Sequence, residues 1–171
     1  MTVQPASNAP LDFRHLIGGF ASGVTVVTTV AKDGTLHGFT ATAFSSVSLA
    51  PPLVLVCLDM SADCHPMFEL TDHFAVSILA TTQRDVAMRF AAKGTDKFAE
   101  LRITKGARTG APLIEDAFVH LECNVHARYA AGDHTVLIGE VVAGHRAEGE
   151  PLLYHARAFG RFEALPTSST P

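Results

Sequence analysis

The chain has 171 residues, of which 47% are hydrophobic and only 18% are charged. This length suits one domain with a single core, and no apolar run reaches the roughly 18 residues that a membrane-spanning helix needs. The formal net charge of −4 argues against a nucleic-acid-binding protein, because such binding depends on Lys and Arg that neutralise phosphates.

The apolar surplus predicts a subunit interface. Residues 1–10 have neither a basic flank nor an apolar segment, so they are expected to be a flexible leader of a cytoplasmic protein. Cys57, Cys64 and Cys123 are an odd number without the spacing of a disulfide framework, which favours reduced thiols.

The first predicted elements are a helix and a β-hairpin. Residues 24–30 are largely β-branched, and the turn sequence at 32–34 precedes another run from Leu36, which predicts the hairpin. Before it, four apolar residues recur at helical spacing and predict a helix with one apolar face, which the following glycines end: Phe13, Leu16, Ile17 and Phe20.

The middle of the chain alternates strands and helices. A second sizeable helix is predicted from residue 82 to 94, where Thr82 and Asp85 resemble a capping box. The other elements predicted here are strands over 53–58 and 74–79 and a short helix over 64–70.

Residues 119–129 alternate apolar and polar side chains, which predicts a half-buried strand. A glycine-containing loop over 130–134 follows, and the next apolar run is predicted to be the partner strand. Asp133 and His134 are therefore expected at the mouth of a long hairpin. Many strands and few helices predict a mainly β fold, namely a closed or split antiparallel barrel with a few flanking helices.

The segment GFTATAFSSVSLAPPLVLVCL at 38–58 is unusual, because a hydroxyl-rich stretch leads directly into a buried strand. Small hydroxyl side chains and backbone N–H groups can hold a phosphate or the polar edge of a flat heterocycle without any lysine. The alternative is an edge strand whose hydroxyls face water. The five hydroxyl residues are Thr40, Thr42, Ser45, Ser46 and Ser48.

Two other kinds of site are not predicted. The glycines of GGFASGVTVV follow a helix and precede a strand, whereas a dinucleotide-binding turn has the reverse order. His120, Cys123 and His126 are evenly spaced, but on a strand Cys123 points to the opposite face, so the three cannot bind one metal ion. A zinc site in which Cys57, Cys64 or His65 meet across strands is kept as a minor alternative, and no metal is expected.

Four motifs together resemble the short-chain NAD(P)H:flavin reductases, which are reductase components of two-component flavin-dependent monooxygenases. The motifs are GFTATAFSSVSLAPPLVLVCL, AMRFAAKGTDKF, YAAGDHTVLIGEV and PLLYHARAFGRF. The resemblance covers residues 11–163 as one domain, leaves 164–171 as a flexible tail, and is closest to the reductases of actinorhodin-type polyketide tailoring. It implies a flavin-binding split β-barrel, antiparallel and Greek-key-like, and a homodimer.

The resemblance also implies roles for individual residues. Thr40, Ala41 and Thr42 would contact the isoalloxazine edge. His134 would lie beside the nicotinamide and is the candidate catalytic residue, with the aromatic ring of Tyr154 near the same site. The resemblance implies three further groups of cofactor-binding residues. Near the ribityl and phosphate groups lie Ser45, Ser46 and Ser48. Near the ring lie Cys57, Leu58 and Asp59, and on the phosphate side lie Arg89, Phe90, Lys93 and Lys97.

The function implied is transfer of a hydride from NADH to FMN or FAD, with release of reduced flavin to a partner monooxygenase. The alternative is a flavin carrier without a nicotinamide site, and His134 argues against it because a carrier needs no histidine at the hairpin mouth. The sequence leaves FMN or FAD open. It favours NADH over NADPH, since no arginine cluster marks a site for a 2′-phosphate.

Overall fold

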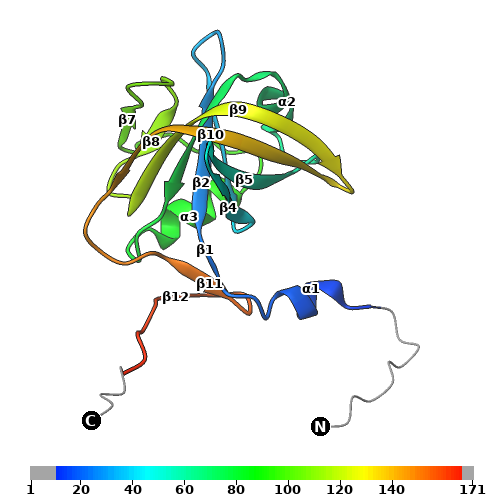
Figure 1. Ribbon diagram of the computed structural model, residues 1–171, viewed down its shortest axis with the longest axis vertical. Helices are drawn as coiled ribbons and strands as arrows, with labels where there is room; N and C mark the ends of the chain where they lie inside the picture. Colours follow the sequence, from blue (N-terminus) through cyan, green and yellow to red (C-terminus); the bar gives the residue numbers. More distant parts are fainter. Residues whose placement is uncertain (1–10, 167–171) are drawn as a thin grey trace.

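A computed structural model describes residues 11–166 as a barrel-like β-sheet with a smaller sheet beneath it (Figure 1). The predicted leader, residues 1–10, and most of the predicted tail lie outside the described residues. No helix of the described part is long and apolar enough to cross a membrane.

Short helices flank this β-structure. The helices are α1 (Phe13–Ile17), α2 (His65–Leu70) and α3 (Arg84–Ala91). The strands are β1 (Ser22–Gly23), β2 (Thr25–Val30), β3 (Leu36–Ala41), β4 (Phe44–Leu49), β5 (Pro52–Asp59), β6 (His73–Ile78), β7 (Ile103–Lys105), β8 (Pro112–Ile114), β9 (Val119–Ala131), β10 (His134–Arg146), β11 (Leu153–His155) and β12 (Ala158–Gly160).

The main sheet has seven strands in the order β3-β2-β6-β9-β10-β5-β4, and every pairing in it is antiparallel. Its two end strands, β3 and β4, follow each other in sequence and are joined only by Thr42 and Ala43. The sheet therefore curls into a barrel that is split between β3 and β4, which confirms the split-barrel prediction. A split of this kind leaves backbone groups of both end strands without strand partners.

The core fills the barrel and continues beneath β2. Val27, Phe39, Phe74 and Leu137 are buried inside the barrel. On the opposite face of β2, Val26 packs in a second cluster with residues of α3, β8 and the segment before β11. This two-sided burial explains why residues 24–30 are apolar or β-branched throughout instead of alternating.

Helix α3 lies against β3 through two specific contacts. The hydroxyl of Thr40 donates a hydrogen bond to the carbonyl oxygen of Ala87 at 2.6 Å. The ring of Phe90 lies so close to Gly38 that a Cβ there would be 2.7 Å from its Cε1 atom. Glycine at position 38 is therefore required for this packing, because any side chain would displace the buried ring.

The hairpin prediction for the second half of the chain is confirmed, with one correction. β9 and β10 pair from His134 opposite Ala131 to Arg146 opposite Val119. Glu122, which the alternating pattern assigned to the polar face, is only 6% exposed. The loop between β7 and β8 covers it, because the carboxylate accepts hydrogen bonds from the N–H of Arg108 and from the N–H and hydroxyl of Thr109.

One prediction about helices is confirmed and one is wrong. The first helix forms and ends at Ile17, just before Gly18, and its apolar side chains are exposed because α1 stands clear of the barrel (Figure 1). The capping box at Thr82 does not form, since α3 begins at Arg84 and its N-cap is Gln83. The side chain of Gln83 is used elsewhere: it accepts from the N–H of Ala80 and donates to the carbonyl oxygen of Glu115.

Candidate functional site

Two cavities meet at the split between β3 and β4. The smaller has a volume of about 280 Å³ and the larger about 890 Å³. Thr40, Thr42 and Ala91 line both of them. Ligand sites in proteins usually measure roughly 300–1,000 Å³, so the two together have the size of a site for a cofactor and a co-substrate.

The smaller cavity lies where three elements end. Its walls come from the end of β3 and the residues after it, from the last residues of β5 and from the C-terminal end of α3. Leu58 and Phe90 supply buried apolar surface, while Thr42 is exposed at the split. An apolar wall beside a polar, hydroxyl-bearing edge suits a flat heterocyclic ring.

Two lysines give this cavity a positive side. The ammonium group of Lys97 donates to the carbonyl oxygens of Gly38 and Phe90 at 3.1 and 3.0 Å. Lys93 donates to the carbonyl oxygen of Ser61 at 2.9 Å. Neither lysine forms an ion pair within the described part of the chain, so both charges are available to an anionic ligand.

His134, the first residue of β10, also lines this cavity. It lies opposite Asp59 in the β5–β10 register, and its Nδ1 atom is 2.6 Å from Oδ1 of Asp133. This hydrogen bond and the nearby imidazole hold the pKa of Asp133 below its usual value. The pKa of Asp59 is also lowered, first by hydrogen bonds from Ser61 and then by the charges of His134 and Lys93. Two carboxylates thus flank the imidazole at the mouth of the hairpin.

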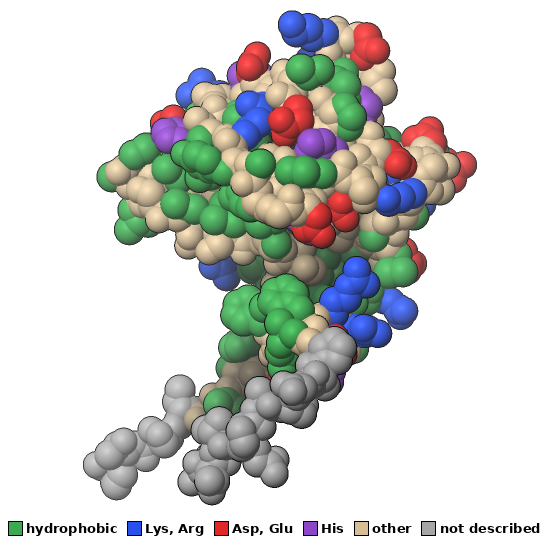
Figure 2. Space-filling model, turned by 90° about the vertical axis from the view of Figure 1, so that its right-hand side faces the viewer, with side chains coloured by type: hydrophobic (Ala, Val, Ile, Leu, Met, Phe, Trp, Pro, Cys, Tyr) green, Lys and Arg blue, Asp and Glu red, His purple; other side chains and the backbone are tan. Residues whose placement is uncertain are grey.

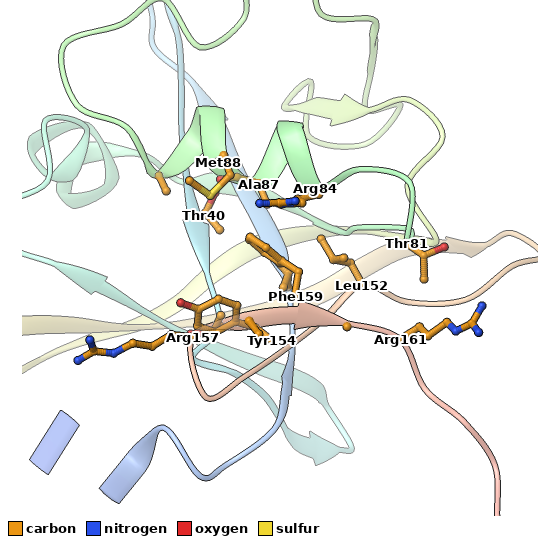
Figure 3. A pocket seen from close by; sticks show the side chains of 15 residues that line it. Thr40, Thr81, Arg84, Ala87, Met88, Leu152, Tyr154, Arg157, Phe159 and Arg161 are labelled. Atoms are coloured by element: carbon orange, nitrogen blue, oxygen red, sulfur yellow. The ribbon is translucent and has the colours of Figure 1, made fainter. Parts of the chain in front are cut away.

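The larger cavity lies between α3 and the small sheet of β1, β11 and β12 (Figure 3). Tyr154 and Phe159 pair across β11 and β12, with ring centroids 5.2 Å apart in an edge-to-face arrangement. The guanidinium of Arg84 lies 5.7 Å from the centroid of the Phe159 ring. An aromatic wall with cationic groups beside it therefore faces the helix.

Comparison with known proteins identifies the family. The family described as "Flavin reductase like domain" matches residues 17–163. The chain belongs to this flavin reductase family.

Named relatives and a solved structure agree with this assignment. The chain is 48% identical to actinorhodin polyketide dimerase of Streptomyces coelicolor, over 85% of this chain and 82% of that one. It is 38% identical to the reductase component of the 4-nitrophenol 4-monooxygenase/4-nitrocatechol 2-monooxygenase of Rhodococcus opacus, over 94% and 84% of the two chains. The NADH:FAD oxidoreductase of Streptomyces globisporus, solved in complex with NAD and FAD fragments, superposes with a TM-score of 0.83 at 41% identity, covering 88% of this chain and 90% of that one.

Most residues that the resemblance singled out lie around one cavity of this flavin reductase domain. Tyr154 lines the larger cavity, which Thr40 and Thr42 share. The smaller cavity brings together residues from β3, β5, α3 and β10: Thr40, Ala41, Thr42, Cys57, Leu58, Asp59, Phe90, Lys93, Lys97 and His134.

Four residues singled out with them line neither cavity. Ser45, Ser46 and Ser48 lie on β4, the end strand of the sheet, and the first two are exposed. Arg89 points away from both cavities and donates to the carbonyl oxygen of Ala99 at 2.8 Å. β4 is thus an edge strand, as in the alternative interpretation in which the hydroxyls face water.

The sequence analysis missed an arginine cluster. Arg84, Arg157 and Arg161 all line the larger cavity, although Arg84 is more than 70 positions away from the other two in the sequence. The tertiary packing of α3 over β11 and β12 brings them together. A signal was present in the motif HARAFGR, which places two arginines on either side of an aromatic residue.

Proposed function

We propose that this chain is an NADH-dependent flavin reductase that transfers a hydride from NADH to FMN or FAD and supplies reduced flavin to a separate monooxygenase. The observation that carries the proposal is the cavity at the barrel split, which is lined by residues 40–42 and by His134. Membership of the flavin reductase family supports the same function.

The residues around the smaller cavity fit a flavin. A ring placed there would have Leu58 and Phe90 as apolar neighbours and the hydroxyl of Thr42 and the backbone of residues 41–43 at its polar edge. When bound, the flavin supplies the redox chemistry, because it accepts a hydride at N5 from nicotinamide C4.

The protein itself contributes position and charge. Lys93 and Lys97 offset negative charge on the flavin phosphate or on the reduced ring, since both line the cavity and neither forms an ion pair in the described chain. His134 orients the nicotinamide by contact with its carboxamide, and Asp133 fixes the imidazole by its hydrogen bond to Nδ1. No general acid or base of unusual strength is required, because holding the two rings at contact distance accounts for the rate.

The proposal includes a homodimer in the cytoplasm. Support for the dimer comes from five large apolar side chains near the N-terminus that are 55–74% exposed: Leu11, Phe13, Leu16, Ile17 and Phe20. Figure 2 shows hydrophobic side chains gathered on the segment beneath the barrel, where α1 lies in Figure 1. The cytoplasmic location is supported by three cysteines that form no disulfide.

The direct test is anaerobic mixing of the protein with NADH and either FMN or FAD. Loss of the oxidised flavin absorption band should be much faster than in a protein-free control. A protein that binds flavin but does not accelerate its reduction would be the carrier instead, and the proposal would then be wrong.

A further inference from the structure

Two loops meet at the edge of the smaller cavity. The β5 loop, residues 60–64, follows strand β5, and the α3 loop, residues 92–97, follows helix α3. Both line the cavity, the first through Ala62 and Asp63 and the second through Lys93 and Lys97. The hydrogen bonds between these loops therefore fix the shape of this wall.

Asp63 connects the β5 loop to the backbone of the α3 loop. The N–H of Gly94 donates a hydrogen bond to Oδ2 of Asp63 at 3.0 Å. Gly94 has a φ of 67°, the left-handed conformation that favours glycine at a turn. The carboxylate thus holds the turn itself, next to Lys93, whose ammonium group reaches back to the carbonyl oxygen of Ser61 at 2.9 Å.

The end of the α3 loop is held separately, by β3 and α3. Lys97 donates to the carbonyl oxygens of Gly38 and Phe90. The ring of Phe98 then packs edge-to-face on that of Phe90, with 5.0 Å between the centroids. Within residues 11–166, the backbone of 93–95 makes no hydrogen bond other than the one to Asp63. The position of this turn therefore depends on that one contact.

A negative charge at this place is unfavourable for an anionic ligand. Asp59 and Asp63 are the only acidic residues of the described chain that line the smaller cavity, and both are exposed. A carboxylate beside a phosphate repels it, so Asp63 has to contribute something other than its charge. The hydrogen bond from Gly94 is that contribution, and an uncharged acceptor of the same shape could make it equally well.

We infer that Asp63 is a positioning residue for flavin binding: its side chain holds the turn at Gly94 and so keeps Lys93 on the phosphate side of the smaller cavity. This inference rests on the proposed function, because it places the flavin in that cavity. Without the hydrogen bond, residues 93–95 would lose conformational freedom only when the phosphate binds, and this cost weakens binding.

A comparison of FMN with riboflavin separates this role from general damage to the site, because riboflavin has the same ring but no phosphate. Asp63→Ala should raise the dissociation constant of FMN by about fivefold or more, measured by quenching of flavin fluorescence. The dissociation constant of riboflavin should stay the same. An equal loss for both flavins, or no loss for either, would overturn the inference.

Asp63→Asn separates the hydrogen bond from the charge, because the amide keeps an acceptor oxygen. This variant should bind FMN at least as tightly as the wild type, and an affinity as low as that of Asp63→Ala would contradict the inference. Asp33→Ala is the matched control. Asp33 is also exposed and accepts from a backbone N–H, that of Thr35 at 2.9 Å, but it lines neither cavity.

Amide hydrogen exchange tests the contact without any ligand. The peptide that contains residues 92–97 should exchange faster in Asp63→Ala than in the wild type or in Asp63→Asn. Equal protection in all three proteins would show that Asp63 does not hold the turn, and the inference would be wrong. A wild-type protein that binds FMN but does not reduce it would refute the proposed function alone, because the exchange and binding comparisons would still decide the role of Asp63.

Discussion

The charged side chains around the smaller cavity are positioned by neighbours before any ligand arrives. Lys97 is fixed by two carbonyl oxygens, Lys93 by Ser61, and His134 by Asp133. Groups that are already in place lose little conformational freedom when a ligand binds. Substitution of a single residue here should therefore change binding or catalysis more than stability.

His134→Ala is expected to raise the KM for NADH or slow flavin reduction by tenfold or more, a loss of about 1.4 kcal/mol. Flavin affinity and folding should stay nearly unchanged, because the imidazole is about 40% exposed and its one hydrogen bond is to an exposed carboxylate. Stopped-flow reduction at several NADH concentrations measures the effect, with the exposed His145→Ala as control. A normal rate with a normal KM would show that the nicotinamide binds elsewhere.

The role of Ser45 and Ser46 in phosphate binding stays a prediction. Both side chains are exposed, so their substitution should not disturb folding. If they bind the flavin phosphate, the double variant Ser45→Ala/Ser46→Ala loses hydrogen bonds to a charged group worth roughly 1.5–3 kcal/mol each. Flavin affinity, measured by fluorescence quenching, should then fall by at least tenfold. Thr104→Ala removes an exposed hydroxyl from a strand away from the cavities and serves as control. An unchanged dissociation constant would assign both serines to an edge strand that faces water.

Partly buried hydrogen bonds tie neighbouring elements together. Thr40 ties β3 to α3, and Glu122 ties β9 to the loop between β7 and β8. A Cβ at Gly106 in that loop would lie 2.5 Å from Oε2 of Glu122, so the backbone comes very close to the carboxylate. Since the carboxylate is buried and accepts three hydrogen bonds from the loop, its loss should loosen the whole loop.

The ionisation of Glu122 predicts how stability depends on pH. Burial by itself raises its pKa, but the hydrogen bonds from Thr109 and Arg108 outweigh burial and lower it below the usual value. Its contribution to stability is therefore complete above the ordinary glutamate pKa of about 4.3 and is lost as the pH falls through the lower folded-state value.

Glu122→Gln should consequently lower the free energy of unfolding at pH 7 by about 1.5–3 kcal/mol. The difference in unfolding free energy between variant and wild type should shrink as the pH falls from about 5 to about 3, because Glu122 becomes protonated over this range. Urea denaturation across this range measures both effects, and the exposed Glu148→Gln is the control. A difference that stays constant with pH would mean that Glu122 is not ionised in the folded protein.

On the scale of the whole molecule, the exposed side chains of α1 are the clearest sign of a missing contact. α1 has five residues, none of them buried, and it stands apart from the barrel (Figure 1). Monomeric proteins rarely leave so many large apolar side chains together in water. A second copy of the chain would cover this surface and bury the exposed apolar side chains.

Light scattering at micromolar concentration should accordingly give the mass of a dimer. Leu16→Glu/Ile17→Glu should shift the mass toward the monomer, because two charges would be buried in the interface without partners. Leu70→Glu is the control, since Leu70 is 74% exposed at the end of α2. A wild-type monomer, or a dimer unaffected by the α1 substitutions, would contradict this arrangement.

The sequence by itself determined most of the strands and the family. Local signals sufficed for the hairpin of β2 and β3, the apolar strand β5 and the long hairpin of β9 and β10, because side-chain periodicity and turn residues act over a few positions. The same local signals singled out Thr40 and Thr42 in the hydroxyl-rich stretch and His134 at the mouth of the long hairpin. The short strands β7, β8, β11 and β12 gave no such signal, since three residues are too few to show a period.

Only the tertiary structure decided which face of each element is covered. Glu122 is buried because a loop closes over a face that the pattern assigned to solvent, and α1 is exposed because nothing in the described chain packs on its apolar face. Arg84 lines the same cavity as Arg157 and Arg161 because α3 lies over the small sheet, although more than 70 positions separate it from them in the sequence. Burial and clustering depend on contacts between distant segments, and periodicity along one segment carries no information about those contacts.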